Sequence, residues 1–276
     1  MEGKGGEQMN IDHLLSGLGY SGSFSYTEIH GGKDSMVFKL VNDDNILALR
    51  IISSDRLPQF KREKKLMELA RERGIPTPKV YTVKAIGEFA VMVMDWVPGK
   101  TVLSALQENP ACAYVLGFNF GQTQARINQI PLPEEWREDN WLTPVLEEEE
   151  ILKAVTPSGN QLLHLDYHPL NVMTDGENIV GVIDWMNAAR GDCRFDFSRT
   201  YSILELEGAK VFRDYIEVLR TFRKGWQEGY ESLVGVMDDM SAFHAWAGKR
   251  MQRDLSNRIL PNEYIIIEQW IQSWLH

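Results

Sequence analysis

One polar block in the second half of the chain restricts the fold more than any other feature. The segment His164–Asn171 reads HLDYHPLN, and a later apolar run, Ile179–Ile183, ends directly before Asp184. Pro169 makes a helix through the first segment unfavourable, because proline lacks an amide donor and restricts the residue before it. The sequence therefore predicts a polar loop followed by a buried strand that ends in a carboxylate.

The polar residues of this block are those that phosphoryl transfer requires. Asp166 and Asn171 have the H-x-D-x-x-x-x-N spacing, in which the aspartate accepts a proton from a hydroxyl group. Asn171 and Asp184 offer hard oxygen ligands, which suit Mg²⁺. The pattern predicts Asp166 as the catalytic residue, with Asn171 and Asp184 as the metal ligands.

Other interpretations of the block stay open on the sequence alone. A His-x-Asp pair is common in capped turns and hydrogen-bonded cores, and Asp184 alone is compatible with a strand-end cap. His164, Asp166 and His168 are also ligand types for a metallohydrolase site. No ligand-spaced pair occurs among the remaining histidines, which are His13, His30, His244 and His276.

Composition narrows the class of protein. The 276 residues are 43% hydrophobic, which is enough for one large domain or two lobes with real cores. The formal net charge of -10 argues against nucleic-acid binding, which needs a basic face. Two cysteines are too few for a disulfide framework, and neither a signal peptide nor an 18-residue apolar run is present. We expect a cytoplasmic protein without a membrane segment, and the oligomeric state stays open.

Secondary-structure signals change character at Pro98 and Gly99. Before this point the patterns predict helices at 11–18 and 60–73, and strands at 25–30, 36–41, 46–52, 80–86 and 89–96. After it they predict short strands at 162–165, 171–174 and 179–183, among helices at 101–107, 111–130, 144–155, 211–226, 240–255 and 263–275. The glutamates at 147–150 are expected on a solvated helix face. The whole pattern indicates an α+β protein.

On these motifs the chain resembles the aminoglycoside phosphotransferase family, which has a protein-kinase-like fold. The resemblance rests on the catalytic block, on Arg62-Glu63, and on the segments 93–99, 181–185 and 191–196. It implies a bilobal α+β fold with a small sheet and one long helix in residues 1–97 and a mainly helical lobe in residues 98–276. It also implies an enzyme that transfers the γ-phosphoryl group of ATP, or GTP, with Mg²⁺, to a hydroxyl group of a small molecule.

The resemblance further implies which residues hold the nucleotide phosphates. Arg50 stands where such kinases often have lysine, and it would pair with Glu63 and reach the phosphates. The alternative for Arg50 is an exposed strand residue. The short loop from Gly31 to Ser35 would cover the phosphates with its backbone N–H groups, so Ser35 is also assigned to this site.

The segment from Met94 to Val97 is the implied hinge. Backbone groups of Asp95 and Val97 would meet the nucleobase and Met94 would line its pocket, with ATP as the default nucleotide. By the same resemblance, Asp196 anchors the catalytic loop and His164 holds the shape of the loop.

The acceptor is expected to be a cationic, hydroxylated small molecule, with an aminoglycoside-type antibiotic as the leading hypothesis. The reason is the acidity of the chain beyond the catalytic block, because carboxylates near a cleft attract amines. The acidic residues in question are Glu205, Glu207, Asp214, Glu217, Glu228, Glu231, Asp238, Asp239, Glu263 and Glu268. The alternatives are a kinase of an amino alcohol or sugar, and a catalytically weak, kinase-like nucleotide-binding protein.

Overall fold

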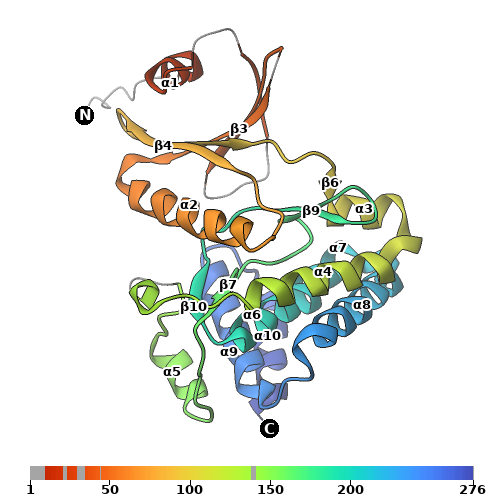
Figure 1. Ribbon diagram of the computed structural model, residues 1–276. Helices are drawn as coiled ribbons and strands as arrows, with labels where there is room; N and C mark the ends of the chain where they lie inside the picture. Colours follow the sequence, from red (N-terminus) through yellow and green to blue (C-terminus); the bar gives the residue numbers. More distant parts are fainter. Residues whose placement is uncertain (1–9, 21–23, 30–34, 44, 138–140, 276) are drawn as a thin grey trace. The chain divides into compact units, whose positions relative to one another are not determined.

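The computed structural model describes residues 10–20, 24–29, 35–43, 45–137 and 141–275, and the chain divides into two compact units (Figure 1). The first unit is Met1–Glu68 with Pro78–Trp96, and the second is Leu69–Thr77 with Val97–His276. Residues 69–77, which the sequence-based division placed in the first lobe, belong to the second unit. There the N–H of Val182 donates a hydrogen bond to the carbonyl oxygen of Pro76 at 2.7 Å.

The first unit is built on a five-stranded sheet in the order β1-β2-β3-β5-β4, in which every neighbouring pair is antiparallel. Short connections join β2 to β3 and β4 to β5, as antiparallel neighbours allow, whereas the helix Leu57–Glu72 lies between β3 and β4. The predicted strands are confirmed with small shifts at their ends. Their bounds are β1 Ser25–Glu28, β2 Met36–Val41, β3 Ile46–Ser53, β4 Val80–Ile86 and β5 Phe89–Asp95.

Different helices pack on the two faces of this sheet, because successive side chains of a strand point to opposite faces. Leu49 of β3 packs in an apolar cluster with Leu14 of helix α1, which spans Ile11–Gly17 and is capped by Asn10. Arg50, the next residue of β3, pairs instead with Glu63 of helix α2, which spans Leu57–Glu72. Helices α1 and α2 therefore cover opposite faces (Figure 1).

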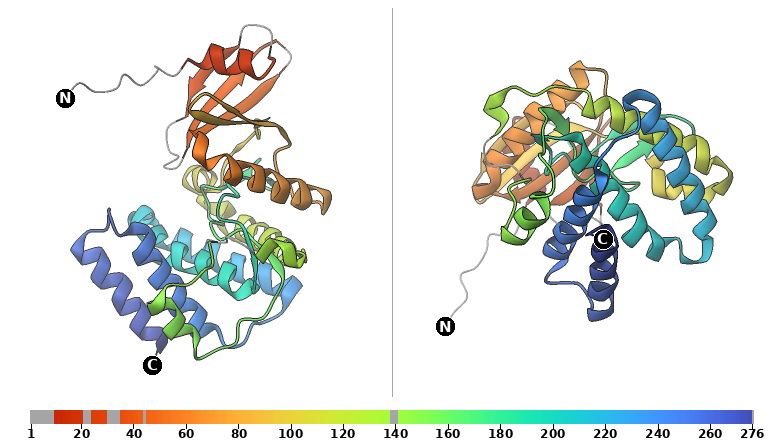
Figure 2. Two further views of the ribbon diagram at one scale, coloured as in Figure 1. Left: turned by 90° about the vertical axis from the view of Figure 1, so that its left-hand side faces the viewer. Right: turned by 90° about the horizontal axis from the view of Figure 1, so that it is seen from below.

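The second unit is mainly helical, as predicted, and contains two small sheets. Strands β6, β8 and β9 form one sheet and β7 and β10 the other. The strands are β6 Lys100–Thr101, β7 Gln161–Leu163, β8 Val172–Thr174, β9 Ile179–Val182 and β10 Ala189–Gly191. The helices are α3 Val102–Glu108, α4 Ala113–Asn128, α5 Leu146–Leu152, α6 Cys193–Ser202, α7 Ala209–Val211, α8 Ile216–Val234, α9 Met240–Leu255 and α10 Pro261–Leu275. Figure 2 shows α9 and α10 side by side.

Glycines let α4 and α8 pack with their backbones in close contact. A Cβ atom on Gly121 of α4 would lie 2.0 Å from the carbonyl oxygen of Trp226, and one on Gly229 of α8 would lie 2.1 Å from that of Phe118. Any larger side chain at these positions would force the helices apart, since protein interiors are close-packed. This packing fixes α4, whose Phe120 carbonyl oxygen accepts a hydrogen bond from the hydroxyl of Tyr167, in the predicted catalytic loop, at 2.9 Å.

A buried ion pair joins α5 to α9. The Glu148 carboxylate accepts hydrogen bonds from Arg250 Nε at 2.8 Å and from Arg250 Nη2 at 2.6 Å, and both side chains are fully buried. The expectation that residues 147–150 form a solvated helix face is therefore wrong for Glu148. The spacing of the four glutamates along α5 does not show that Arg250 of α9 forms an ion pair with one of them.

Nowhere in the described parts of the chain is a helix long and apolar enough to cross a membrane.

Candidate active site

Asp166 and Asn171 of the predicted catalytic loop are in direct contact. Asn171 Nδ2 donates hydrogen bonds to Asp166 Oδ2 and to the carbonyl oxygen of Asp166, both at 3.0 Å, and lies 3.2 Å from His168 Nε2. The amide nitrogen is the only donor of the Asn171 side chain. Since this nitrogen faces the loop, the carbonyl oxygen Oδ1 is the atom that Asn171 can offer to a cation.

Asp184 is brought to this loop by the end of β9. The N–H of Ile183 donates a hydrogen bond to the carbonyl oxygen of Asn171 at 2.9 Å, so Asp184 directly follows a residue tied to Asn171. The backbone of Asp184 has a φ of 60°, and that of Leu165 has a φ of 63°. Such left-handed conformations are unfavourable for residues other than glycine and often occur at functional sites. Here they turn the chain at a predicted metal ligand and directly before the predicted base.

His164 holds the loop and is not positioned to act as a base. It is fully buried, its Nε2 lies 3.0 Å from the carbonyl oxygen of Ile183, and its Nδ1 accepts a hydrogen bond from the N–H of Asp166 at 3.3 Å. Burial lowers the pKa of His164, although nearby carboxylates act in the opposite direction. A neutral ring with hydrogen on Nε2 satisfies both contacts. The structural role implied by the resemblance is thus confirmed.

The metallohydrolase interpretation finds no support in this geometry. Both ring nitrogens of His164 serve the loop, so neither is available to a metal. Within the described ranges, moreover, no three histidine, cysteine, aspartate or glutamate side chains gather as a metal-binding group.

Asp196 anchors the loop, as the resemblance implied. Its Oδ1 accepts a hydrogen bond from the N–H of Leu165 at 2.6 Å, and its Oδ2 accepts one from Asn128 Nδ2 at 2.8 Å. One turn later on α6, Thr200 Oγ1 donates to the carbonyl oxygen of Tyr167 at 2.8 Å. Helix α6 is therefore hydrogen-bonded to the loop on both sides of Asp166.

The surroundings of Asp166 keep its carboxylate ionised. Burial by itself would raise the pKa of Asp166, but the hydrogen bond and charge of His168, with the charge of Arg199, outweigh it and lower the pKa to about 2. So weak a base does not remove a proton from a free hydroxyl group at neutral pH. It can hold the hydroxyl in place and take the proton as the new bond to phosphorus forms.

Arg199 is a part of this environment that the motifs did not reveal. It lies on α6 between the two anchoring residues, and its Nη2 donates to Asp254 Oδ2 of α9 at 3.1 Å. Its guanidinium group also lies 4.9 Å from the ring of Trp141. The only sequence signal is its spacing of three residues from Asp196, which places both on one helix face.

The predicted phosphate-binding pair is present in the first unit. Arg50 Nη1 lies 2.5 Å from Glu63 Oε1, and both side chains are buried, so the alternative of an exposed strand residue is wrong for Arg50. Ser35 is half-buried and directly precedes β2. The other residues of the predicted phosphate-covering loop, 31–34, lie outside the described residues.

The expected hinge residues are divided between the units. Met94 is buried near the end of β5, and Asp95 is tied to β4, where its Oδ1 accepts from the Tyr81 hydroxyl at 2.6 Å and its N–H donates to the carbonyl oxygen of Lys79. Val97 belongs to the second unit and packs on Gly181, where an added Cβ would lie 2.5 Å from Val97 Cγ1. The N–H of Asp95 is thus engaged within the sheet, while Val97 is set by β9.

A small antiparallel sheet with one long helix, and a helical unit that carries this loop, define the class of kinase-like phosphotransferases. The model of the phosphotransferase enzyme family (APH) matches residues 25–156 and 139–242. The chain belongs to this family, and it is accordingly a small-molecule phosphotransferase.

Solved structures show the same fold over nearly the whole chain. A thermostable mutant of aminoglycoside phosphotransferase APH(4)-Ia is 15% identical, with 95% of this chain and 97% of that chain covered and a TM-score of 0.66. A putative fructosamine-3-kinase from Haemophilus somnus is 13% identical, with 96% of both chains covered and a TM-score of 0.64. Spectinomycin phosphotransferase APH(9)-Ia is 12% identical, with 95% and 93% covered and a TM-score of 0.60. The predicted kinase-like α+β fold is confirmed.

A comparison with curated proteins gives no match to this sequence.

Proposed function

We propose that this phosphotransferase uses Mg²⁺ to move the γ-phosphoryl group of ATP to a hydroxyl group of a small molecule. The observation that carries the proposal is the contact between Asn171 and Asp166, with Ile183 hydrogen-bonded to Asn171. It gathers one ionised carboxylate and two residues with hard oxygen donors on two adjoining segments. Asp166 would orient the acceptor hydroxyl and take its proton.

The donor set fits a magnesium ion that also binds nucleotide phosphates. Asn171 Oδ1 and the Asp184 carboxylate would hold Mg²⁺, which commonly takes one or two protein ligands and completes its shell with phosphate oxygens and water. When bound, the ion would neutralise charge on the phosphates. The protein would contribute two oxygen ligands, from Asn171 and Asp184, on the segments that adjoin Asp166.

The phosphate-binding part of the nucleotide assignment rests on the first unit. The Arg50 guanidinium, fixed by Glu63, would bind phosphate oxygens, with Ser35 near them. Met94 would line the base pocket, and the backbone at Asp95 and Val97 would meet the base. ATP is preferred over GTP because structural neighbours were solved with adenine nucleotides: APH(4)-Ia with AMP-PNP and hygromycin B, and APH(9)-Ia with ADP and spectinomycin. The cytoplasm, expected from the sequence, would supply ATP.

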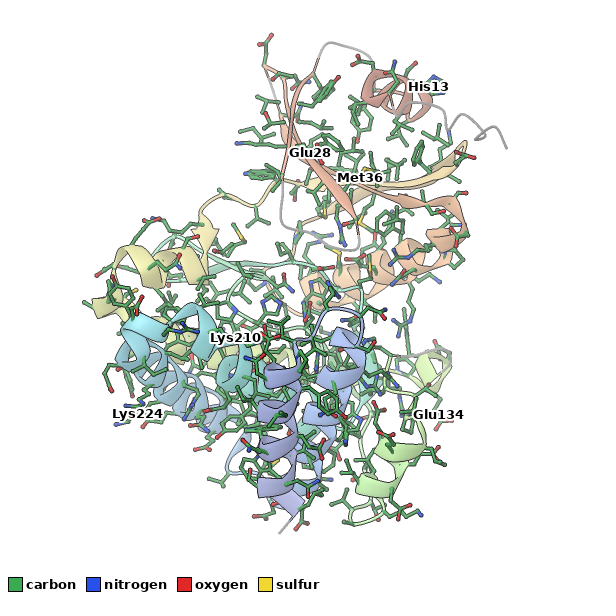
Figure 3. The ribbon with its side chains drawn as sticks, turned by 180° about the vertical axis from the view of Figure 1, so that it is seen from behind. His13, Glu28, Met36, Glu134, Lys210 and Lys224 are labelled. Carbon is green, nitrogen blue, oxygen red and sulfur yellow. The ribbon has the colours of Figure 1, made fainter. Side chains whose placement is uncertain are left out.

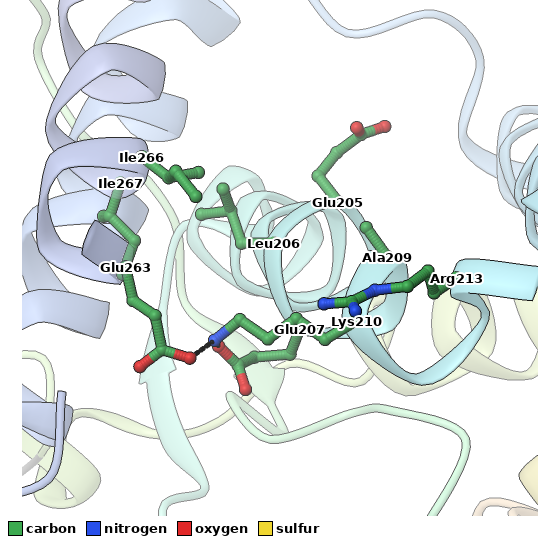
Figure 4. A pocket seen from close by; sticks show the side chains of 9 residues that line it. All are labelled: Glu205, Leu206, Glu207, Ala209, Lys210, Arg213, Glu263, Ile266 and Ile267. Carbon is green, nitrogen blue, oxygen red and sulfur yellow. Dashed lines mark hydrogen bonds and ion pairs between the residues drawn. The ribbon is translucent and has the colours of Figure 1, made fainter. Parts of the chain in front are cut away.

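A cationic acceptor of the aminoglycoside type remains the leading hypothesis for the second substrate. One cavity of about 180 Å³ in the second unit is lined by Glu205, Glu207 and Glu263, together with Lys210 and Arg213 (Figure 4). Such carboxylates attract amines.

Several of these carboxylates are already paired within the protein. Lys210 Nζ, labelled in Figure 3, contacts Glu207 at 2.7 Å and Glu263 at 2.8 Å, and Glu205 is paired with Arg223. An amine must therefore compete with internal cations. This weakens the electrostatic argument and keeps an amino alcohol or sugar as the second candidate.

The test is a phosphoryl-transfer screen with radiolabelled ATP and GTP, with and without Mg²⁺, against aminoglycosides, amino alcohols and sugars. The proposal predicts Mg²⁺-dependent transfer that is lost in Asp166→Asn. Nucleotide binding without transfer to any acceptor would favour the kinase-like binding protein. Use of neutral or anionic acceptors alone would refute the cationic hypothesis and leave the phosphotransferase assignment intact.

A further inference from the structure

Arg199 is a buried cation whose hydrogen-bonding capacity is mostly unused. Its residue exposure is 5%, and Nη2 donates to Asp254 at 3.1 Å. Its Nε and Nη1 atoms are buried and have no hydrogen-bond partner among the described residues. A guanidinium group carries five N–H donors, and leaving buried donors without acceptors is costly, more so when the group is charged.

The position of Arg199 is fixed relative to the catalytic loop. Asp196 and Thr200 of the same helix bond to Leu165 and Tyr167, the two neighbours of Asp166 in the chain. Arg199 lies between these anchors, and its charge contributes to the lowered pKa of Asp166. Arg199 is therefore held on the helix that is hydrogen-bonded to both neighbours of Asp166, the carboxylate that would face the acceptor hydroxyl.

We propose that Arg199 binds an oxyanion of the acceptor, a carboxylate or phosphate group close to the hydroxyl group that is phosphorylated. An oxyanion satisfies buried N–H groups of a guanidinium with short, charge-assisted bonds, and the planar fork suits two oxygens at once. The inference rests on the proposed phosphotransferase function, and it replaces the purely cationic, aminoglycoside-type acceptor considered above with an acceptor that carries an oxyanion.

The same residues restrict where a positive charge can sit on the acceptor. A purely cationic molecule would meet the fixed charge of Arg199 near the reacting hydroxyl. Asp254, whose side chain is 31% exposed, is the carboxylate beside it and can face an amine. An acceptor with an amine and an oxyanion therefore fits the surroundings of Arg199 and Asp254 better than an acceptor with amines alone.

The experiment compares hydroxyl compounds that differ by one anionic group. Ethanolamine and L-serine differ by a carboxylate, as do ethylene glycol and glycerate, and glycerol with glycerol 3-phosphate tests a phosphate. Binding of each compound to the enzyme loaded with Mg²⁺ and AMP-PNP is measured by calorimetry. We expect the anionic member of at least one pair to bind about 10-fold or more tightly than its partner, the scale of one charge-assisted hydrogen bond.

Variants then assign the preference to the guanidinium group. Arg199→Lys keeps the charge and removes the fork, and Arg199→Gln removes both. Both should reduce the preference about 10- to 100-fold, while AMP-PNP affinity changes little. Arg220→Lys on α8, where the side chain is 63% exposed, is the matched control and should bind as the wild type does.

Each outcome decides the proposal. Equal binding of both members of every pair by the wild type, or no binding of any anionic member, overturns it. So does a preference that survives in both Arg199 variants, or a loss of thermal stability without a change in preference, because a buried water molecule would then be the partner of Arg199. Failure of the proposed function has a different signature, namely no AMP-PNP binding or no transfer from ATP to any hydroxyl compound.

Discussion

The side-chain amide of Asn171 donates a hydrogen bond to the carboxylate of Asp166 at 3.0 Å. This contact joins the predicted metal ligand to the predicted base and turns the carbonyl oxygen of Asn171 away from Asp166. The two residues therefore act as one unit, and the effects of substitutions at both should not add.

Asp166→Asn should lower phosphoryl transfer about 10²- to 10⁴-fold, because the amide keeps the shape of the side chain but does not accept the proton. Folding and nucleotide affinity should stay close to those of the wild type. Transfer kinetics, nucleotide titration and a thermal melt check this. Turnover near the wild-type rate would exclude the role as base, and a large fall in Tm would favour a structural role.

Asn171→Ala and Asp184→Ala should both act through the metal. Asn171→Ala should raise the Mg²⁺ concentration needed for half-maximal rate, and Asp184→Ala should remove nearly all activity because it also removes a charge. Metal titrations with Mg²⁺ and Mn²⁺ measure this. An unchanged metal requirement in Asn171→Ala would refute its role as a ligand.

Arg50→Ala should weaken nucleotide use more than acceptor binding, because the guanidinium group fixed by Glu63 is proposed to reach the phosphates. Arg50→Lys should keep part of the activity, since lysine is common at such sites. Separate KM values for ATP and acceptor distinguish the effects. If Arg50→Ala leaves the KM for ATP unchanged, the pair has only a structural role.

Acid should destabilise the protein through His244. Burial among aromatic side chains lowers the pKa of His244 to about 4, below the ordinary value of 6.5. Between these two values the unfolded chain binds a proton that the folded chain does not, so stability falls as pH falls, by roughly 1.4 kcal/mol per pH unit. Urea unfolding at pH 7 and pH 5 should differ by about 2 kcal/mol from this group.

His244→Gln should remove this part of the pH dependence. His164, also buried with a lowered pKa, acts in the same direction, and its contribution remains in the variant. His13→Gln, at an exposed position, is the control and should leave the difference between pH 7 and pH 5 as it is. An identical pH dependence in wild type and His244→Gln would contradict the assignment.

Glu148→Gln should destabilise the second unit by about 3–5 kcal/mol, because it removes the charged partner of the buried Arg250. Glu149→Gln, one residue along the same helix but exposed, is the matched control and should change stability by less than about 0.5 kcal/mol. Chemical denaturation of both variants measures the difference. Equal stabilities of the two variants would show that the stability of the protein does not depend on the pairing of Glu148 with Arg250.

Sequence patterns predicted the bounds of those strands and helices that depend mainly on residues close together in the chain. The hairpin strands Met36–Val41 and Val80–Ile86 and the helix Met240–Leu255 have the predicted bounds, because alternation and helical periodicity report directly on burial. The helix predicted at 211–226 begins and ends later in the chain. Helix α8 spans Ile216–Val234, and a π-helical turn at Ile203–Gly208 precedes it. Such a turn depends on packing against neighbouring helices and leaves no simple periodicity.

Residue type and spacing were enough to predict the α+β class, the order of most strands and helices, and the candidate residues with the right chemistry. They did not predict the strand Ala189–Gly191, and the way in which distant segments meet depends on tertiary packing. Ile183 joins Asp184 to the loop, Asp196 and Thr200 of α6 bond to Leu165 and Tyr167, and Arg250 pairs with Glu148. These contacts join residues far apart in the chain, and their energies come from burial and hydrogen bonds that exist only after the helices have packed.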